Sequence, residues 1–153
     1  MAEETTQPER QFVLQKIYVK DVSFETPNSP EVFTLKWEPK VEFNLSSNAQ
    51  KLQENLYEVS LTTTVTVKLG EKTAYLVEVC QAGIFAMAGF DDQELGPLIG
   101  SYCPNVLFPY AREAVSDLVT KGGFPPMLLA PINFDALYMQ QMQQQQGSAP
   151  TSH

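Results

Sequence analysis

YEVSLTTTVTVKLGEKTAYLVEVCQ, residues 57–81, contains the pattern that decides the fold. In its first arm, residues 57–69, the side chains at even positions are polar. The apolar side chains fall on odd positions: Tyr57, Val59, Leu61, Val65, Val67 and Leu69. A period of two is typical of a β-strand with one buried face, so this arm is predicted to be such a strand.

The second arm, residues 73–81, continues the alternation and predicts a β-hairpin. A three-residue loop, residues 70–72, would place odd positions opposite odd positions, so that the two arms share an apolar face. The even face of the second arm is mixed, because Ala74, Leu76 and Cys80 lie there beside Glu78. Such a half-apolar, half-acidic outer face is a plausible docking surface.

Two further strands are predicted upstream, at residues 12–25 and 40–45. The first is apolar on both faces, which fits either a central strand or an edge strand that packs against a second subunit. Between them, a long crossing connection carries Trp37, which either fills the core or forms a wall of a binding groove. Residues 46–55 are predicted to be a polar loop.

Helices are predicted in the C-terminal half. The glycine-bounded segment 82–90 is interpreted as a packed loop, and Asp91 with Glu94 forms a capping box that starts a short helix ending near Ile99. After a turn at residues 103–105, a helix with Asn105 as N-cap runs to Lys121. Proline-rich residues 124–131 should press along the body, and Asn133 should cap a last helix.

Composition restricts the function more than any single motif. The 153 residues suit one domain, and a charged content of only 18% indicates that surface is hidden in an assembly. A net charge of -8 argues against nucleic acid or an anionic membrane as the main partner. The N-terminus does not resemble a secretory signal and no apolar run reaches the length of a membrane span, so we expect a cytoplasmic protein with reduced cysteines.

Catalysis is not expected. The only histidine is His153, near the C-terminus, so Ser-His and Cys-His nucleophile pairs and histidine-based metal sites are excluded. No glycine-rich nucleotide cradle is present. Asp91 and Asp92 are explained more simply by helix capping than by acid-base chemistry. We therefore expect a binding protein that has no cofactor and no metal site.

Three long stretches resemble the protein-export chaperone family SecB: IYVKDVSFETPN (residues 17–28), GSYCPNVLFPYARE (100–113) and LAPINFDAL (129–137). The resemblance continues in the same order from about residue 12 to residue 146. It implies an α+β fold with a four-stranded antiparallel sheet, a long crossover between its first two strands and helices on one face, assembled as a homotetrameric dimer of dimers. One domain, residues 11–146, would lie between disordered tails, residues 1–10 and 147–153.

The same resemblance implies an ATP-independent holdase, which keeps unfolded precursor proteins competent for export and delivers them to the SecA motor. The expected SecA-docking residues are Asp21, Glu25, Leu76 and Glu78, and any zinc would belong to the partner. The expected client groove consists of Trp37, Val41, Phe43, Leu45, Phe85, Met87, Phe134, Leu137 and Tyr138. Family members are expected to carry a cysteine directly before the glutamate equivalent to Glu78, whereas this chain has Cys80. The alternative is a non-catalytic adaptor that binds one folded partner through its acidic face.

Overall fold

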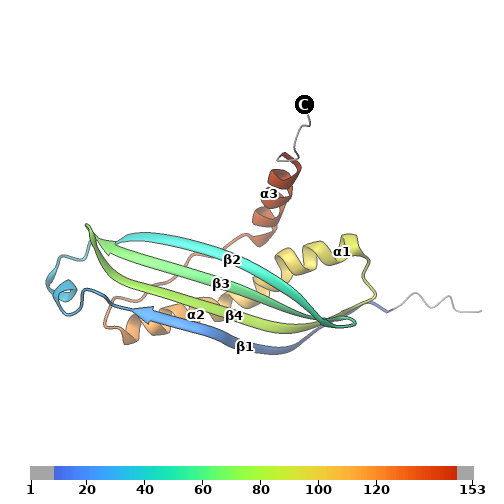
Figure 1. Ribbon diagram of the computed structural model, residues 1–153, viewed down its shortest axis with the longest axis horizontal. Helices are drawn as coiled ribbons and strands as arrows, with labels where there is room; N and C mark the ends of the chain where they lie inside the picture. The colour runs from blue at the N-terminus through green and yellow to red at the C-terminus, as the bar shows by residue number, and fades with distance from the viewer. Residues whose placement is uncertain (1–8, 148–153) are drawn as a thin grey trace, which may run out of the picture.

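One antiparallel sheet forms the body of the protein, with the strand order β1-β4-β3-β2 (Figure 1). The computed structural model describes residues 9–147. The strands are β1 (Gln11–Glu25), β2 (Lys40–Gln53), β3 (Leu56–Leu69) and β4 (Lys72–Ala88). Because β1 and β2 are the two edges, residues 26–39 cross from one edge to the other. The predicted sheet and crossing connection are confirmed, and β1 is an edge strand.

The β3–β4 hairpin shares an apolar face as predicted, since Val65 lies opposite Val77. Its turn is shorter than expected. Leu69 pairs with Lys72, which leaves a two-residue turn in which Gly70 has a φ of 64°, a conformation that favours glycine. A bulge at Ala74 then restores the odd-to-odd register. Ala74, predicted to point outward, is therefore fully buried.

Two bulges explain why β1 appears apolar on both faces. Gln15 and Lys20 have no partner in the register with β4. Each extra residue reverses the alternation that follows it, because successive side chains point to opposite faces. As a result, six apolar side chains share the face of the β4 core residues: Phe12, Leu14, Ile17, Val19, Val22 and Phe24. The polar residues Asp21, Ser23 and Glu25 lie on the other face.

Two strands extend further than the sequence patterns suggested. Residues 46–53, predicted as a polar loop, continue β2, and residues 82–88, predicted as a packed loop, continue β4. The β2 extension is polar because it is an exposed edge strand. In β4, a Cβ at Gly83 would lie 3.1 Å from the Leu107 side chain. This glycine therefore allows a helix to pack closely on the strand, rather than marking a loop.

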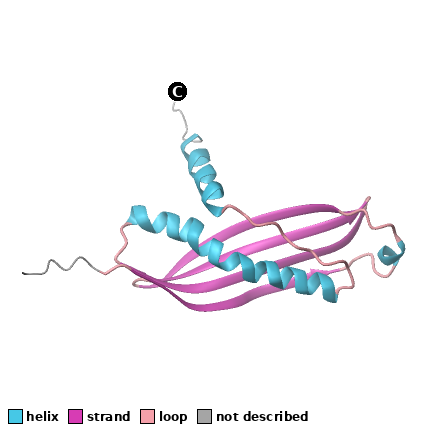
Figure 2. Cartoon of the chain, turned by 180° about the vertical axis from the view of Figure 1, so that it is seen from behind, coloured by secondary structure: helices cyan, strands magenta, loops and turns pink. Residues whose placement is uncertain are grey.

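The helical segments α1 (Asp92–Pro97), η2 (Leu98–Tyr102) and α2 (Cys103–Lys121) follow one another without a break (Figure 2). The Asp91–Glu94 capping box is present as predicted. The predicted turn at residues 103–105 and the Asn105 N-cap were wrong. The Cys103 amide instead donates to the Leu98 carbonyl, five residues back, in a π-helical turn. Pro104, which has no N–H to donate, follows directly in the first turn of α2.

Helix α2 covers one face of the sheet, here called the inner face; the opposite face is called the outer face. Leu107, Ala111, Val115 and Val119 are fully buried against β3 and β4. The predicted packing of a helix on one face is confirmed for α2. In contrast, α3 (Phe134–Gly147) projects away from the body (Figure 1). Within residues 9–147, no helix is long and apolar enough to cross a membrane.

Candidate binding surfaces

An apolar groove lies between β2 and the start of α3. Its volume is about 540 Å³, and its apolar lining residues are Phe43, Leu45, Ile132, Ala136 and Leu137. The register with β3 places Val41, Phe43 and Leu45 on the inner face of β2. Phe43 is 42% exposed and Leu137 is 40% exposed. The groove therefore presents large apolar side chains to solvent, which is unusual unless they serve an interaction.

The groove is open because α2 leaves the edge strand β2 uncovered. α2 packs on β3 and β4. Beside Phe43 and Leu45 of β2 lie the start of α3 and Ile132, at the end of the extended segment 124–133 (Figure 2). In this segment Met127, Leu129 and Ile132 are half-buried, as predicted for a chain pressed along the body. Leu128 is 80% exposed and was not predicted to contribute to a surface.

A cluster of aromatic side chains surrounds the buried ring of Phe124 on the inner face, away from α3. The Trp37 ring centroid is 6.0 Å from that of Phe124, and the Phe33 centroid is 5.0 Å from it. Trp37 is 36% exposed, so it is neither sealed in the core nor free in water. Phe33 is half exposed and was missed as a site residue, although its position in the same apolar connection as Trp37 was the available signal.

Two residues expected in the groove are in the core instead. Phe85 and Met87 are at most 1% exposed, because they lie on the inner face of β4 in the cluster that contains Leu107 of α2. The groove prediction was wrong for these two residues because residues 82–90 were predicted to be a loop, whereas residues 82–88 continue the strand alternation of β4. Phe134 is also buried, with its ring 5.7 Å from that of Phe108. Phe134 anchors the first turn of α3, and the α3 side of the groove is lined by Ala136 and Leu137.

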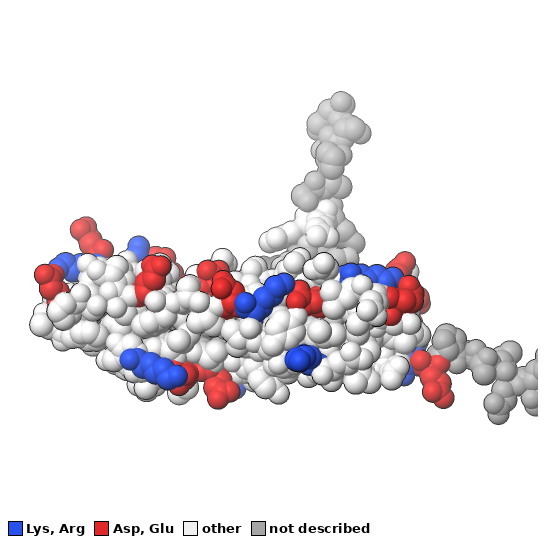
Figure 3. Space-filling model, turned by 60° about the horizontal axis from the view of Figure 1, so that its bottom comes forward, with Lys and Arg blue, Asp and Glu red and all other residues white. Residues whose placement is uncertain are grey.

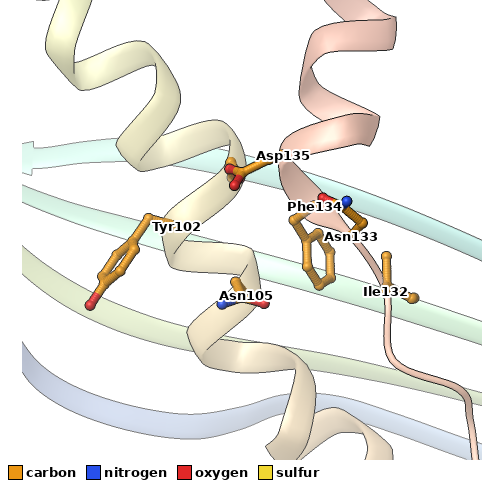
Figure 4. A pocket seen from close by; sticks show the side chains of 7 residues that line it. Tyr102, Asn105, Ile132, Asn133, Phe134 and Asp135 are labelled. Atoms are coloured by element: carbon orange, nitrogen blue, oxygen red, sulfur yellow. The ribbon is translucent and has the colours of Figure 1, made fainter.

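A small polar pocket of about 170 Å³ marks the base of α3 (Figure 4). Asn133 Oδ1 accepts a hydrogen bond from the Ala136 amide at 3.0 Å, which confirms the predicted N-cap. The buried Ser101 hydroxyl donates to the Asp135 carboxylate. Since these polar groups are used to fix α3 against η2, the pocket is a structural joint rather than a binding site.

The four predicted docking residues lie together on the outer face. Glu25 is opposite Leu76, and Ser23 separates Glu25 from Asp21 while lying opposite Glu78. All three carboxylates belong to exposed residues. No ion pair seen among residues 9–147 includes any of them, although the Thr64 hydroxyl donates to Glu78 at 3.3 Å. Three exposed carboxylates at neighbouring register positions make this cluster a local concentration of negative charge. On the face of the molecule drawn in Figure 3, acidic and basic side chains are scattered among uncharged ones.

A further carboxylate on the outer face, that of Glu58, is paired with a lysine. Lys20 Nζ lies 2.8 Å from Glu58 Oε1, and the Tyr18 hydroxyl donates to Oε2. These two hydrogen bonds hold the pKa of Glu58 below its ordinary value of 4.5, and the bond from Lys20 has the larger effect. Burial, together with the Glu58 charge, raises the pKa of Tyr18 to about 12. The sequence patterns missed this cluster because Lys20 is a bulge residue whose direction the alternation does not give.

The two cysteines are unpaired, as expected, and lie on different layers. Cys80 is half-buried on the outer face, where the alternation placed it, while Cys103 is buried at the start of α2. Burial raises the pKa of the Cys103 thiol to about 12, so it is inert at neutral pH. In the part of the chain that the structure describes, no three His, Cys, Asp or Glu residues are grouped so that they could hold a metal ion.

Comparison with known proteins shows similarity to one family along almost the whole chain. A family model described as preprotein translocase subunit SecB matches residues 4–145. The protein-export protein SecB of Methylococcus capsulatus is 77% identical to this chain, over 100% of both sequences. That of Nitrosococcus oceani is 63% identical over 94% of this chain and 90% of its own length.

A solved structure shares the fold. It is a SecB-like chaperone of Mycobacterium tuberculosis in complex with a peptide from an antitoxin. The match has a TM-score of 0.67 and covers 79% of this chain and 90% of the other. Because the two sequences are only 15% identical, the likeness supports the architecture and not the residues of a site.

Proposed function

Because this chain belongs to the SecB family of protein-export chaperones, we propose that it is an ATP-independent holdase of the cytoplasm. It binds unfolded precursor proteins, keeps them competent for translocation and delivers them to SecA. The observation that carries the proposal is the solvent-exposed apolar groove between β2 and α3. Unfolded clients offer scattered apolar segments, and an open apolar groove binds such segments with little demand for a particular sequence.

The proposed client-binding residues are Trp37, Val41, Phe43, Leu45, Leu137 and Tyr138, with Phe134 as the floor under α3. They come from three segments: Trp37 from the crossing connection, Val41, Phe43 and Leu45 from the edge strand β2, and the others from the terminal helix α3. Aromatic side chains offer a large contact area at a low cost in conformational entropy, which suits a site with many clients. Holding a client unfolded needs only preferential binding to its unfolded state, so no nucleotide is required.

The proposed SecA-docking surface consists of Asp21, Glu25, Leu76 and Glu78. Three unpaired carboxylates around one half-buried leucine suit a basic partner that also offers an apolar contact. We expect complementary charge to speed the encounter and salt to weaken it. The zinc implied by the family resemblance would be held by the partner.

The proposed assembly is a dimer of dimers. Three apolar side chains on the inner face of β1 are more than a third exposed, namely Leu14, Val19 and Val22, as is Tyr110 of α2. An uncovered apolar edge strand favours self-association, so these residues are the proposed contacts between subunits. Such contacts would bury the apolar surface that, given the low share of charged residues, we expect to be hidden in an assembly.

The test is refolding of a destabilised client protein in the absence of nucleotide. At an excess of this protein, we expect refolding to slow and aggregation to fall. Unchanged refolding kinetics would contradict the holdase function. The adaptor alternative predicts that charge reversal at Asp21 and Glu78 abolishes all binding, whereas the holdase should keep client binding.

A further inference from the structure

The terminal helix α3 touches the body through a narrow contact. It packs chiefly against η2, the π-helical segment between α1 and α2. At its base, Phe134 is buried and Asp135 is bonded to the Ser101 hydroxyl. One turn further along α3, the half-buried ring of Tyr138 lies over Gly96 and Gly100. The direction in which α3 leaves the body therefore depends on how closely Tyr138 approaches these two glycines.

The two glycines are needed for space, and each makes room for a different part of the tyrosine. A Cβ at Gly100 would lie 2.5 Å from Cδ2 and 2.6 Å from Cε2 of the Tyr138 ring. A Cβ at Gly96 would lie 2.7 Å from the phenol oxygen and 3.9 Å from Cζ. Carbon atoms do not approach this closely, so a methyl group at Gly100 displaces the whole ring and one at Gly96 displaces only its tip.

The same contact borders the apolar groove. Gly100 and Tyr138 line a hollow together with Leu45 of β2 and Leu137 of α3. Leu45 and Leu137 also line the larger groove beside it. Since one face of α3 forms a groove wall while Tyr138 rests on the glycines, lifting Tyr138 moves Leu137 relative to β2.

We propose that Gly96 and Gly100 are positioning residues for client binding: they seat Tyr138 at the depth that sets the width of the groove between β2 and α3. This inference rests on the proposed holdase function. Neither glycine touches the client. They act through α3. Gly100 lies in the π-helical segment η2 and Gly96 in α1, directly before it, and π-helical turns are frequent at functional sites.

The test compares Gly96→Ala and Gly100→Ala, each alone and combined with Tyr138→Phe, which keeps the ring and removes the hydroxyl. The probe is a reduced and alkylated, permanently unfolded protein. We expect Gly100→Ala to weaken its binding about tenfold and Gly96→Ala about threefold. Tyr138→Phe should restore binding to Gly96→Ala and leave Gly100→Ala defective. Tyr138→Phe alone sets the baseline for the two double variants. Val13→Ala, on the outer face of β1, is the control and should bind as the wild type does.

Hydrogen exchange of residues 134–145 provides a second measurement. Gly100→Ala should speed exchange there and leave β3 and β4 protected, which separates displacement of α3 from general misfolding. Wild-type affinity in Gly100→Ala, or no rescue of Gly96→Ala by Tyr138→Phe, would overturn the positioning role alone. Failure of the wild type to bind the unfolded probe would overturn the holdase function, and this inference with it.

Discussion

The ε-ammonium of Lys20 lies 2.8 Å from Oε1 of Glu58, joining the edge strand β1 to β3 across the intervening strand β4. Tyr18, also on β1, donates to the other oxygen of the same carboxylate. Between them, Ala82 of β4 is fully buried. This cluster fixes β1 on the outer face, whereas apolar packing fixes it on the inner face.

The first prediction concerns acid stability. Because the folded-state pKa of Glu58 is lowered, its contribution to stability is complete above the ordinary value of 4.5 and is lost as the pH falls through the lowered value. Glu58→Gln should therefore lower the urea midpoint at neutral pH, and the difference from the wild type should shrink on acidification. Urea titrations across that pH range measure this. Glu54→Gln removes a carboxylate from an exposed ion pair and should change little; equal effects of both variants would contradict the prediction.

The second prediction concerns Thr63, on the inner face between the two apolar clusters of the core. Its hydroxyl is buried and has no hydrogen-bond partner. Thr63→Val keeps the shape and removes the unsatisfied oxygen, so it should raise the free energy of unfolding by about 1 kcal/mol. Thr66→Val, on the outer face of the same strand, is the control and should have less effect. Chemical denaturation of the wild type and the two variants measures the free energy of unfolding. A Thr63→Val protein less stable than the wild type would mean that the Thr63 hydroxyl has a hydrogen-bond partner.

The third prediction concerns the acidic cluster. Asp21→Lys and Glu78→Lys should each weaken SecA binding about tenfold at low salt, because they reverse charges in the proposed docking surface. Wild-type binding should itself weaken as salt is raised. Binding to immobilised SecA, measured beside binding to the unfolded probe, tests both points. Glu54→Lys, at the β2–β3 turn, should preserve SecA binding; a loss of binding there too would point to net charge rather than to this cluster.

The fourth prediction separates groove residues from core residues. Phe43→Ala should weaken client binding about tenfold at a small cost in stability, because the ring is already largely exposed. Phe85→Ala should lower the free energy of unfolding by about 3–5 kcal/mol, because it leaves a cavity under α2. Calorimetry and client titration measure the two quantities. Val13→Ala, on the outer face of β1, should leave client binding intact, and equal losses for Val13 and Phe43 would contradict the groove.

Much of the fold could be predicted because its signals are local. The alternation from Val59 to Val67 gave the central strand and its buried face, and the Asp91 capping box and the Asn133 N-cap gave two helix starts. Strand length was harder to predict. Residues 46–53 have no apolar period because an edge strand needs none, and Gly83 looked like a break although it fits beneath α2.

The candidate sites divide in the same way. Asp21, Glu25 and Glu78 share the outer face, as alternation along their two strands indicated, whereas their docking role comes from family resemblance and stays a prediction. The direction of Lys20 could not be predicted, since a bulge reverses the alternation and only pairing with β4 creates the bulge. Tertiary packing also decided that Phe85 is core while Phe43, on a strand with the same alternation, is exposed.

The sequence by itself determined that there are four strands, the helix caps at Asp91 and Asn133, the excess of apolar residues and the family. Each of these depends on neighbours a few residues apart or on the order of residues along the chain. Only the tertiary structure decided which apolar residues remain exposed, how β1 resolves its two apolar faces and where α3 is seated. Those outcomes depend on what lies across the sheet: α2 covers β3 and β4 and leaves β2 open. A helix of this width cannot cover every strand of the sheet, and the groove is the part that it leaves uncovered.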